Sequence, residues 1–311
     1  MIEFILVKLC TQGVQKMNLA QTVKNGVDLV KTHWKTPPKG RYMPFREIVG
    51  YAGGGIGIKF LAIMATNMML SATNVLIGNT LGVQPLDMYI LYLISVLVNI
   101  PLSGVRANII DNTRSKEGKY RPYIVRMAVP AAIICNILVW FPYAKLSDWL
   151  GTGMIFGETK AYVAKCAIIM FLNLLLHFFY YFFYDAYENL IHVLSPNTQE
   201  RTDVLSIKSV VYSLAPSIAQ FIIPLFSQWF TNNSETDIRL YRITYPIFAL
   251  IGFSLSMIVY ANTQEKIVQA KTRVVQVKFI DAFKAVAKNK YFWIIALAGW
   301  LGFLEGAYSQ L

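Results

Sequence analysis

The chain has 311 residues, of which 55% are hydrophobic and only 15% charged, and its mean hydropathy is +0.45. A soluble domain usually carries about 25% charged residues, so this composition argues against a water-soluble enzyme or binding module. The formal net charge of +12 does not indicate nucleic acid binding, because the basic residues lie between apolar runs, as in loops of membrane proteins. Three cysteines, Cys10, Cys135 and Cys166, do not form a disulfide framework.

Residues 1–46 form a basic leader. Apolar residues recur in it at a spacing that predicts an amphipathic helix lying on the membrane surface, at Leu19, Val23, Val27 and Val30. The pair Pro37-Pro38 and the glycine that follows it then end this surface segment, because two prolines cannot continue a helix.

Six apolar segments, each long enough to cross a bilayer core of ~30 Å, follow the leader. We predict spans at about 48–77, 86–109, 123–143, 161–190, 206–230 and 241–262, and a seventh that begins near Tyr291 and is cut off at Leu311. The predicted fold class is therefore all-α and polytopic. A six-helix bundle occupies residues 47–262, a basic linker 263–290 and the start of a second bundle 291–311.

The linker contains an amphipathic stretch from Val277 to Ala287. The last predicted helix ends without a polar or basic tail, so we expect the sequence to be a fragment whose second half lies beyond Leu311. Lysine and arginine gather in the leader and in the loops after the second and sixth spans, whereas residues 78–86 have none. This predicts a multi-pass protein of the cell (inner) membrane with a cytoplasmic amino terminus.

Ionisable residues inside a span cost at least ~2.5 kcal/mol, so each is a candidate site residue. Lys59 lies ~16 Å into the first span at a rise of 1.5 Å per residue. It follows Gly53, Gly54, Gly55 and Gly57, which allow another helix to approach closely. Lys59 is expected to bind a substrate or ion, or else to form a structural salt bridge.

A polar stripe runs along the cytoplasmic half of the fourth helix, at Tyr181, Asp185, Glu188, Asn189 and His192. Two acids three residues apart share one face and would repel each other, so we expect one of them to be protonated or paired with a cation. Tyr181, Asp185 and Glu188 are candidates for binding a polar substrate, and His192 for lining the cavity. The alternative is a helix end that lies closer to water.

Two further spans carry polar candidates. Lys208, early in the fifth span, is expected either to face Asp185 across a cavity or to reach water. In the second span, Asn99, Ser103 and Arg106 share one helix face. Asn99 and Ser103 are expected to line a cavity or to bond to a neighbouring helix, and Arg106 to reach water near the inner end.

The loop between the second and third spans reads Asp111-Asn-Thr-Arg-Ser-Lys-Glu-Gly-Lys-Tyr-Arg-Pro122. It resembles the signature loop of the glycoside–pentoside–hexuronide:cation symporters, a branch of the major facilitator superfamily, whose pattern is close to D-x-T-x-S-x-x-G-x-x-R-P. The matching residues are Asp111, Thr113, Ser115, Gly118, Arg121 and Pro122. Gly118 permits a tight turn and Pro122 suits a first helical turn. Asp111, Arg114 and Arg121 are expected to form a charge network at an inner gate.

A second segment, Tyr184 to Leu190 followed by Glu200-Arg201-Thr202, is similar to the family's D-x-P-Y-x-x-L motif and its E-R-T-like loop. The alignment slips by one residue and the family's proline is absent. The family's acid binds sugar, which the resemblance assigns to Asp185, or to Glu188 if the register differs. Lys208 matches the basic residue that follows. The resemblance covers about residues 45–311.

The resemblance implies a secondary transporter of a sugar, glycoside or sugar acid that works by alternating access, without a cofactor and coupled, if at all, to H⁺ or Na⁺. Gapless alignment puts Lys59 where the melibiose carriers have a sugar-binding aspartate, and Asn99 and Ser103 where they have cation-binding aspartates. Sodium coupling is therefore not expected. Lys59 is expected to supply a fixed charge in place of the cation or to bind an acidic sugar.

Two alternatives remain open. The first is a carrier of the same fold for a lipid or other amphiphile, and the second is a membrane sensor that no longer transports. The sequence shows no metal-ligand cluster, nucleophile motif or phosphate loop, so an enzyme is not predicted. The expected partners are a small-molecule sugar or glycoside, the lipid bilayer and the second transporter half, with no nucleic acid.

Overall fold

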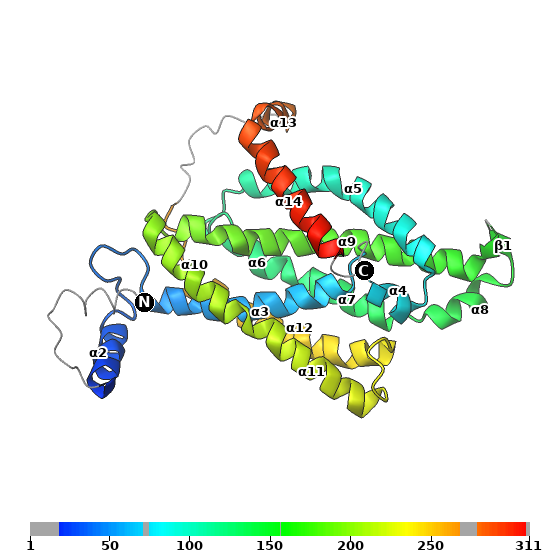
Figure 1. Cartoon of the computed structure of the whole chain (residues 1–311), viewed down its shortest axis with the longest axis horizontal. Coiled ribbons are helices and arrows are strands. Elements are labelled where there is room, and N and C mark those ends of the chain that lie inside the picture. The colour runs from blue at the N-terminus through cyan, green and yellow to red at the C-terminus, as the bar shows by residue number, and fades with distance from the viewer. Residues whose placement is uncertain (1–18, 71–74, 156, 268–278, 309–311) are drawn as a thin grey trace.

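The computed structural model describes residues 19–70, 75–155, 157–267 and 279–308. The sequence-based predictions for residues 1–18, 277–278 and 309–311 lie outside this part of the chain. Helices account for nearly all of the regular structure described (Figure 1). A short antiparallel pair, β1 (Met154–Ile155) with β2 (Glu158–Thr159), follows the 3-10 turn Tyr143–Lys145 and α8 (Leu146–Leu150) in the chain.

The described residues contain six helical segments that are long and apolar enough to cross a membrane. This confirms the predicted all-α, polytopic fold class. The segments are α3 (Phe45–Asn67), α5 (Pro85–Asp111), α6 (Arg121–Arg126) with α7 (Ala128–Trp140), α9 (Lys160–Leu194), α10 (Thr198–Tyr212) with α11 (Leu214–Phe230), and α12 (Ile238–Asn262).

The third and fifth spans are each made of two helices because of a proline. Proline lacks an N–H and its ring clashes with the carbonyl four residues earlier. Pro130 lies four residues after Arg126, the last residue of α6, and Pro216 lies four residues after Tyr212, the last residue of α10. The first span also differs from its prediction, since α3 ends at Asn67 and a separate helix, α4 (Val75–Leu81), follows.

Glycines bring α3 and α12 into close contact, as the sequence predicted. A Cβ added to Gly57 would lie 2.5 Å from the carbonyl oxygen of Gly252, and one added to Gly54 would lie 2.9 Å from the backbone nitrogen of Val259. These distances leave no room for a side chain, because the obstacles are backbone atoms. A Cβ added to Gly53, by contrast, would have no atom within 4 Å of it, so Gly53 takes no part in this contact.

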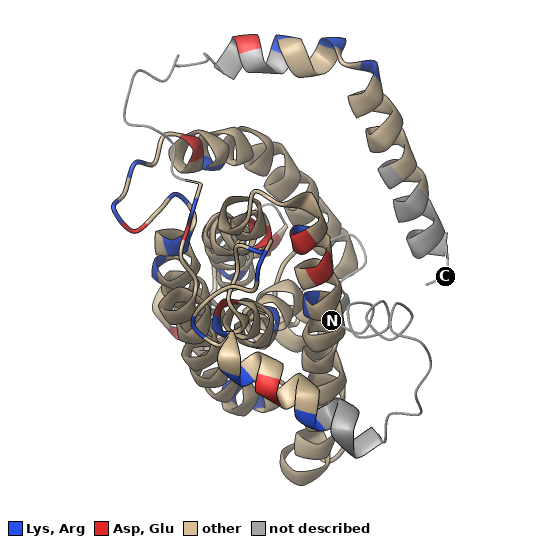
Figure 2. Cartoon of the chain, turned by 90° about the vertical axis from the view of Figure 1, so that its left-hand side faces the viewer, with Lys and Arg blue, Asp and Glu red and all other residues tan. Residues whose placement is uncertain are grey.

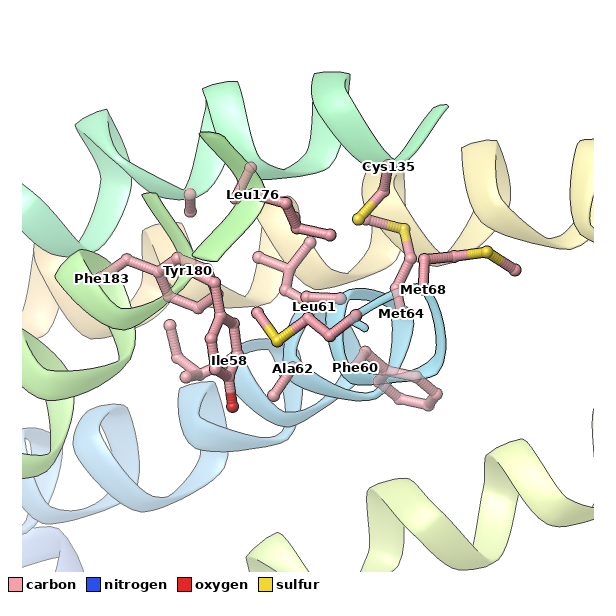
Figure 3. Packing of buried hydrophobic residues seen from close by; sticks show 14 of the residues in the cluster. Ile58, Phe60, Leu61, Ala62, Met64, Met68, Cys135, Leu176, Tyr180 and Phe183 are labelled. Carbon is pink, nitrogen blue, oxygen red and sulfur yellow. The ribbon is translucent and has the colours of Figure 1, made fainter. Parts of the chain in front are cut away.

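The apolar core lies where α3 meets α7 and α9 (Figure 3). Its members interdigitate in one cluster that includes Ile58, Leu61 and Met64 of α3, Leu176, Tyr180 and Phe183 of α9, and Cys135 of α7. Cys135 is fully buried among them and packs as a small apolar residue. Inside a bilayer such contacts act through van der Waals packing rather than through exclusion of water.

One end of the bundle, which we call the leader end, collects the leader and the loops at 111–121, 195–198 and 263–267. Figure 2 views the molecule from this end and shows its charged residues. The predicted amphipathic leader helix is present as α2 (Leu19–Thr32). The predicted linker helix is α13 (Phe279–Lys288), which leads into α14 (Lys290–Tyr308) outside the six-helix bundle (Figures 1 and 2).

Candidate functional site

Three tyrosines from three different helices form a stack at the centre of the candidate site. Tyr51 of α3 stacks on Tyr187 of α9 with ring centroids 5.0 Å apart, and Tyr187 stacks on Tyr212 of α10 at 6.3 Å. The Tyr187 hydroxyl donates to the Tyr51 carbonyl at 3.0 Å. Gly55 makes this possible, because a Cβ at that position would lie 2.1 Å from the Tyr187 hydroxyl oxygen. We call these three residues the tyrosine stack.

Lys208 of α10 places its ammonium group against the tyrosine stack. The Nζ atom lies 4.7 Å from the ring centroid of Tyr187, 5.3 Å from that of Tyr212 and 5.8 Å from that of Tyr51. It also forms a salt bridge of 2.5 Å with Oε2 of Glu188. The side chain of Lys208 is only 7% exposed, so both the ring faces and the carboxylate compensate for its loss of water.

Lys59 of α3 reaches the same group of residues. Its Nζ lies 5.0 Å from the ring centroid of Tyr212, so Lys59 and Lys208 both approach one aromatic ring. Lys59 is half-buried and forms no salt bridge with any carboxylate that the structure describes. The structure therefore brings two cations and one paired acid together beside the tyrosine stack.

A second charged group lies between α5 and α9. Arg106 is buried at 7% exposure, and its Cζ lies 5.2 Å from the ring centroid of Tyr181. Its guanidinium is within electrostatic range of Asp185 and of His177, whose ring centroid is 5.8 Å from that of Tyr181. The expectation that Arg106 reaches water was wrong, because the side chain packs on Tyr181. Its Nε and Nη1 atoms have no hydrogen-bond partner among the described residues.

The expected partner of Lys208 was also wrong. Lys208 pairs with Glu188, whereas Asp185 forms no salt bridge among the described residues and lies within electrostatic range of Arg106. Glu188 and Asp185 lie nearly one helical turn apart on the same side of α9, yet their neighbouring cations come from two different helices, α10 and α5. The prediction that one of the two acids pairs with a cation is confirmed by Glu188.

The other cavity candidates do not join these two groups. Asn99 donates to the carbonyl of Ser95 at 2.8 Å and Ser103 to the carbonyl of Ile100 at 2.7 Å, both within α5 itself. The alternative expectation of bonds from these two side chains to a neighbouring helix is not met among the described residues. Ser103 and His192 are exposed, and in this arrangement neither contributes to the buried part of the site.

The signature loop is anchored by an acid that sequence reasoning missed. The carboxylate of Glu265 accepts the backbone N–H groups of Lys119, Tyr120 and Arg121 at 2.6, 2.7 and 3.0 Å. A carboxylate that accepts free N–H groups at a helix start is stabilised by the helix dipole. Gly118 has a φ of +110°, and a Cβ there would lie 2.3 Å from the Glu265 carboxyl carbon. The turn therefore requires glycine, as predicted.

Asp111 and Arg114 bond within the loop, whereas Arg121 also reaches α12. Asp111 forms a salt bridge of 2.8 Å with Lys119, and Arg114 donates to the carbonyl of Asp111 at 2.9 Å. Partial burial acts to lower the pKa of Lys119, but the hydrogen bond and charge of Asp111 outweigh it and raise that pKa above its ordinary value. Arg121 donates to the carbonyl of Tyr260 at 2.7 Å and stacks on its ring. Pro122 occupies the first turn of α6, as predicted.

A second acid fastens the leader to the bundle. Glu200, which the sequence placed in an E-R-T-like loop, lies in the first turn of α10. Its carboxylate accepts the backbone N–H of Met43 at 2.9 Å and that of Tyr42 at 3.0 Å. It also accepts the Ser195 hydroxyl at 2.5 Å. Sequence reasoning singled out Glu200 only as part of a motif. Nothing in the motif indicates that its carboxylate binds the leader backbone.

Similarity to known proteins identifies the family of the chain. A family model described as MFS/sugar transport protein matches residues 50–309. The chain belongs to the MFS/sugar transport protein family. This is a family of transporters and not of enzymes, and it includes the branch whose signature loop the sequence resembles.

Curated relatives of this family member are distant bacterial proteins. It is 21% identical to an uncharacterized symporter, YnaJ, of Bacillus subtilis over 252 residues, which cover 81% of the chain and 50% of the relative. It is 24% identical to the isoprimeverose transporter of Lactiplantibacillus pentosus, covering 78% of the chain and 46% of the relative. The lactose permease of Leuconostoc lactis is 23% identical, and the match covers 79% of the chain and 37% of the relative. No solved structure matches significantly.

The chain thus spans half or less of the length of the curated relatives that it matches. This family member is a multi-pass membrane protein, like its bacterial symporter relatives. The five charged residues inside the spans, Lys59, Arg106, Asp185, Glu188 and Lys208, lie on α3, α5, α9 and α10, four of the helices within the matched region.

Proposed function

We propose that the chain forms the amino-terminal half of a secondary transporter for a sugar, glycoside or sugar acid, and that it works by alternating access. The observation that carries the proposal is the tyrosine stack with Lys208, Glu188 and Lys59 inside a bundle of sugar-transporter type. Aromatic faces suit the apolar faces of a sugar ring, and charged groups suit its hydroxyls or carboxylate. Two of the curated relatives are named for the sugars isoprimeverose and lactose.

The charge balance of the candidate site favours an acidic substrate. The site contains three cations, Lys59, Arg106 and Lys208, but only two acids, Asp185 and Glu188. Glu188 compensates Lys208 and Asp185 interacts with Arg106, which leaves Lys59 uncompensated within the described residues. A cation at membrane depth is costly unless an anion joins it. We therefore infer that the carboxylate of a sugar acid, such as a hexuronide, contacts Lys59 when the substrate is bound.

Sodium coupling does not fit this site, because Glu188 is paired with Lys208 and Asp185 lies within electrostatic range of Arg106. Asp87 lies at the opposite end of α5, where its carboxylate accepts the Tyr162 hydroxyl at 2.5 Å. In this proposal, fixed positive charges take the place of a bound sodium ion. Transport is then either coupled to protons or uncoupled. The protein lies in the cell membrane with its leader end in the cytoplasm, as the distribution of lysine and arginine indicates.

A binding screen tests the proposal. The thermal stability of the full-length gene product is measured in detergent against matched neutral and acidic glycosides, with and without sodium. A ligand that binds only the folded protein raises its melting temperature by mass action. We expect a shift with acidic glycosides that is the same with and without sodium. A cooperative unfolding transition that no sugar shifts would contradict the proposal and favour a carrier of lipids or a sensor.

A further inference from the structure

A cavity of about 470 Å³ opens at the leader end, and no residue of the tyrosine stack lines it. Four segments form its walls: the leader around Lys35 and Tyr42, the first turn of α3, the first residue of α6, and the chain from the end of α12 to Lys266. We call it the leader-end cavity. Its volume lies within the range of roughly 300–1,000 Å³ that is typical of small-molecule sites.

The lining of the leader-end cavity is strongly cationic. It contains Lys35, Arg46, Arg121 and Lys266, against the single acid Glu47. Glu47 is buried, forms a salt bridge with Lys266 and also accepts the backbone N–H of Gln264 at 2.8 Å. One cation is therefore compensated and three are not.

None of these three cations bonds to a carboxylate in the described part of the chain. Arg46 donates from Nε to the side-chain oxygen of Asn262 at 2.7 Å. Arg121 donates to the carbonyl oxygens of Tyr260 and Glu117 at 2.7 and 3.2 Å, and its buried Nε has no partner there. Neither arginine, nor Lys35, forms a salt bridge with a described carboxylate. Carbonyl oxygens satisfy donors but leave the positive charge in place.

Two further acids close to this end, Glu200 and Glu265, are not among the residues that line the cavity. Glu200 accepts N–H groups of the leader and Glu265 accepts those that begin α6. A concave surface lined by one sign of charge concentrates ions of the opposite sign. Guanidinium groups match the oxygen geometry of phosphate, and lysine adds a point charge.

We propose that the leader-end cavity binds a phosphate-bearing anion through Lys35, Arg46 and Arg121. The phosphate group can belong to a small soluble phosphate or to the headgroup of an acidic phospholipid, since the chemistry recognised is the same. Such a ligand bridges the leader, α3, α6 and the end of α12, and so stabilises the loops that meet at this end. The inference is independent of the transported substrate, because the cavity and the tyrosine stack share no residue.

Thermal unfolding of the purified full-length protein tests this inference in two arms. In the first, the protein in nanodiscs of phosphatidylcholine is titrated with inorganic phosphate, with chloride used to keep the ionic strength constant. In the second, phosphatidic acid replaces part of the phosphatidylcholine and no phosphate is added. A rise in melting temperature in the first arm identifies a soluble phosphate, and a rise in the second arm alone identifies a lipid headgroup.

Variants of exposed residues make the test specific. We expect Lys35→Gln and Arg46→Gln each to weaken phosphate or phosphatidic acid binding on the order of tenfold, as loss of a charge-assisted hydrogen bond should. Lys39→Gln, which removes the same charge from the same leader outside the cavity lining, should leave binding unchanged. The proposal is overturned if neither arm shifts the wild-type protein, or if Lys39→Gln weakens binding as much as Lys35→Gln.

Discussion

Nζ of Lys208 lies 2.5 Å from Oε2 of Glu188, and the two residues come from consecutive spans, α10 and α9. The pair is unequal in burial, since the side chain of Lys208 is 7% exposed and that of Glu188 is 35% exposed. Lys208 thus depends on Glu188 for charge compensation, while Glu188 keeps one side open. An open carboxylate beside a stack of tyrosines is suited to accept hydrogen bonds from sugar hydroxyls in the proposed transporter.

The variant Glu188→Gln leaves a buried ammonium without its counter-charge. Breaking a fully buried ion pair costs about 3–5 kcal/mol, and we expect about 2 kcal/mol here because Glu188 is partly exposed. Denaturant unfolding of the purified protein measures the loss. Adding Lys208→Met should recover much of it, because the double variant removes both charges. A double variant less stable than Glu188→Gln alone would show that the pair does not act as described.

The contact between α3 and α12 predicts opposite results for two neighbouring glycines. Gly57→Ala places a methyl group 2.5 Å from the Gly252 carbonyl oxygen, so the helices must separate, at a cost of roughly 1–3 kcal/mol. Gly53→Ala adds the same methyl group where no atom lies within 4 Å, so it should not destabilise the protein. Melting temperatures of the two variants check this. Equal losses would mean that the two helices do not pack through Gly57.

Glu265→Ala removes the acceptor of three backbone N–H groups at the start of α6. We expect a loss of roughly 1–2 kcal/mol, comparable with removal of a helix cap. Proteolysis of the 111–121 loop should quicken as well, because the loop loses its attachment to the end of α12. Glu235→Ala, an exposed acid in another loop, is the matched control. Unchanged stability and proteolysis in Glu265→Ala would refute the anchoring role.

Much of the fold could be predicted from the sequence because membrane spans are long and apolar. The breaks after Arg126 and Tyr212 were missed, although the prolines four residues later could have indicated them. Gly118 and Pro122 were predicted for the right physical reasons, a tight turn and a first helical turn. The predicted limits of the first span were wrong, because the apolar run in the sequence continues past Asn67, whereas the helix ends there.

The candidate site was less predictable, because pairing depends on distances between helices. Lys59, Glu188 and Lys208 could be identified as costly charges inside spans, and the structure brings all three to one place. Their partners could not be deduced, since Asp185 and Glu188 lie on one helix and either could have met Lys208. Tyr51 and Tyr212 carried no signal at all. Aromatic residues are common in membrane helices, and only the stacking around Tyr187 distinguishes these two.

In the proposed transporter, Lys59 recognises the carboxylate of the sugar acid. Counterflow in proteoliposomes tests this recognition most directly, with a radiolabelled hexuronide and its neutral glycoside measured for wild-type protein, Lys59→Met and Lys59→Arg. We predict that wild-type protein exchanges the hexuronide equally with and without sodium. The rate of hexuronide exchange should be at least about tenfold lower in Lys59→Met, as expected for loss of a buried charge-assisted contact. Lys59→Arg should retain part of the wild-type rate. Exchange by Lys59→Met that equals the wild-type rate would contradict this role of Lys59.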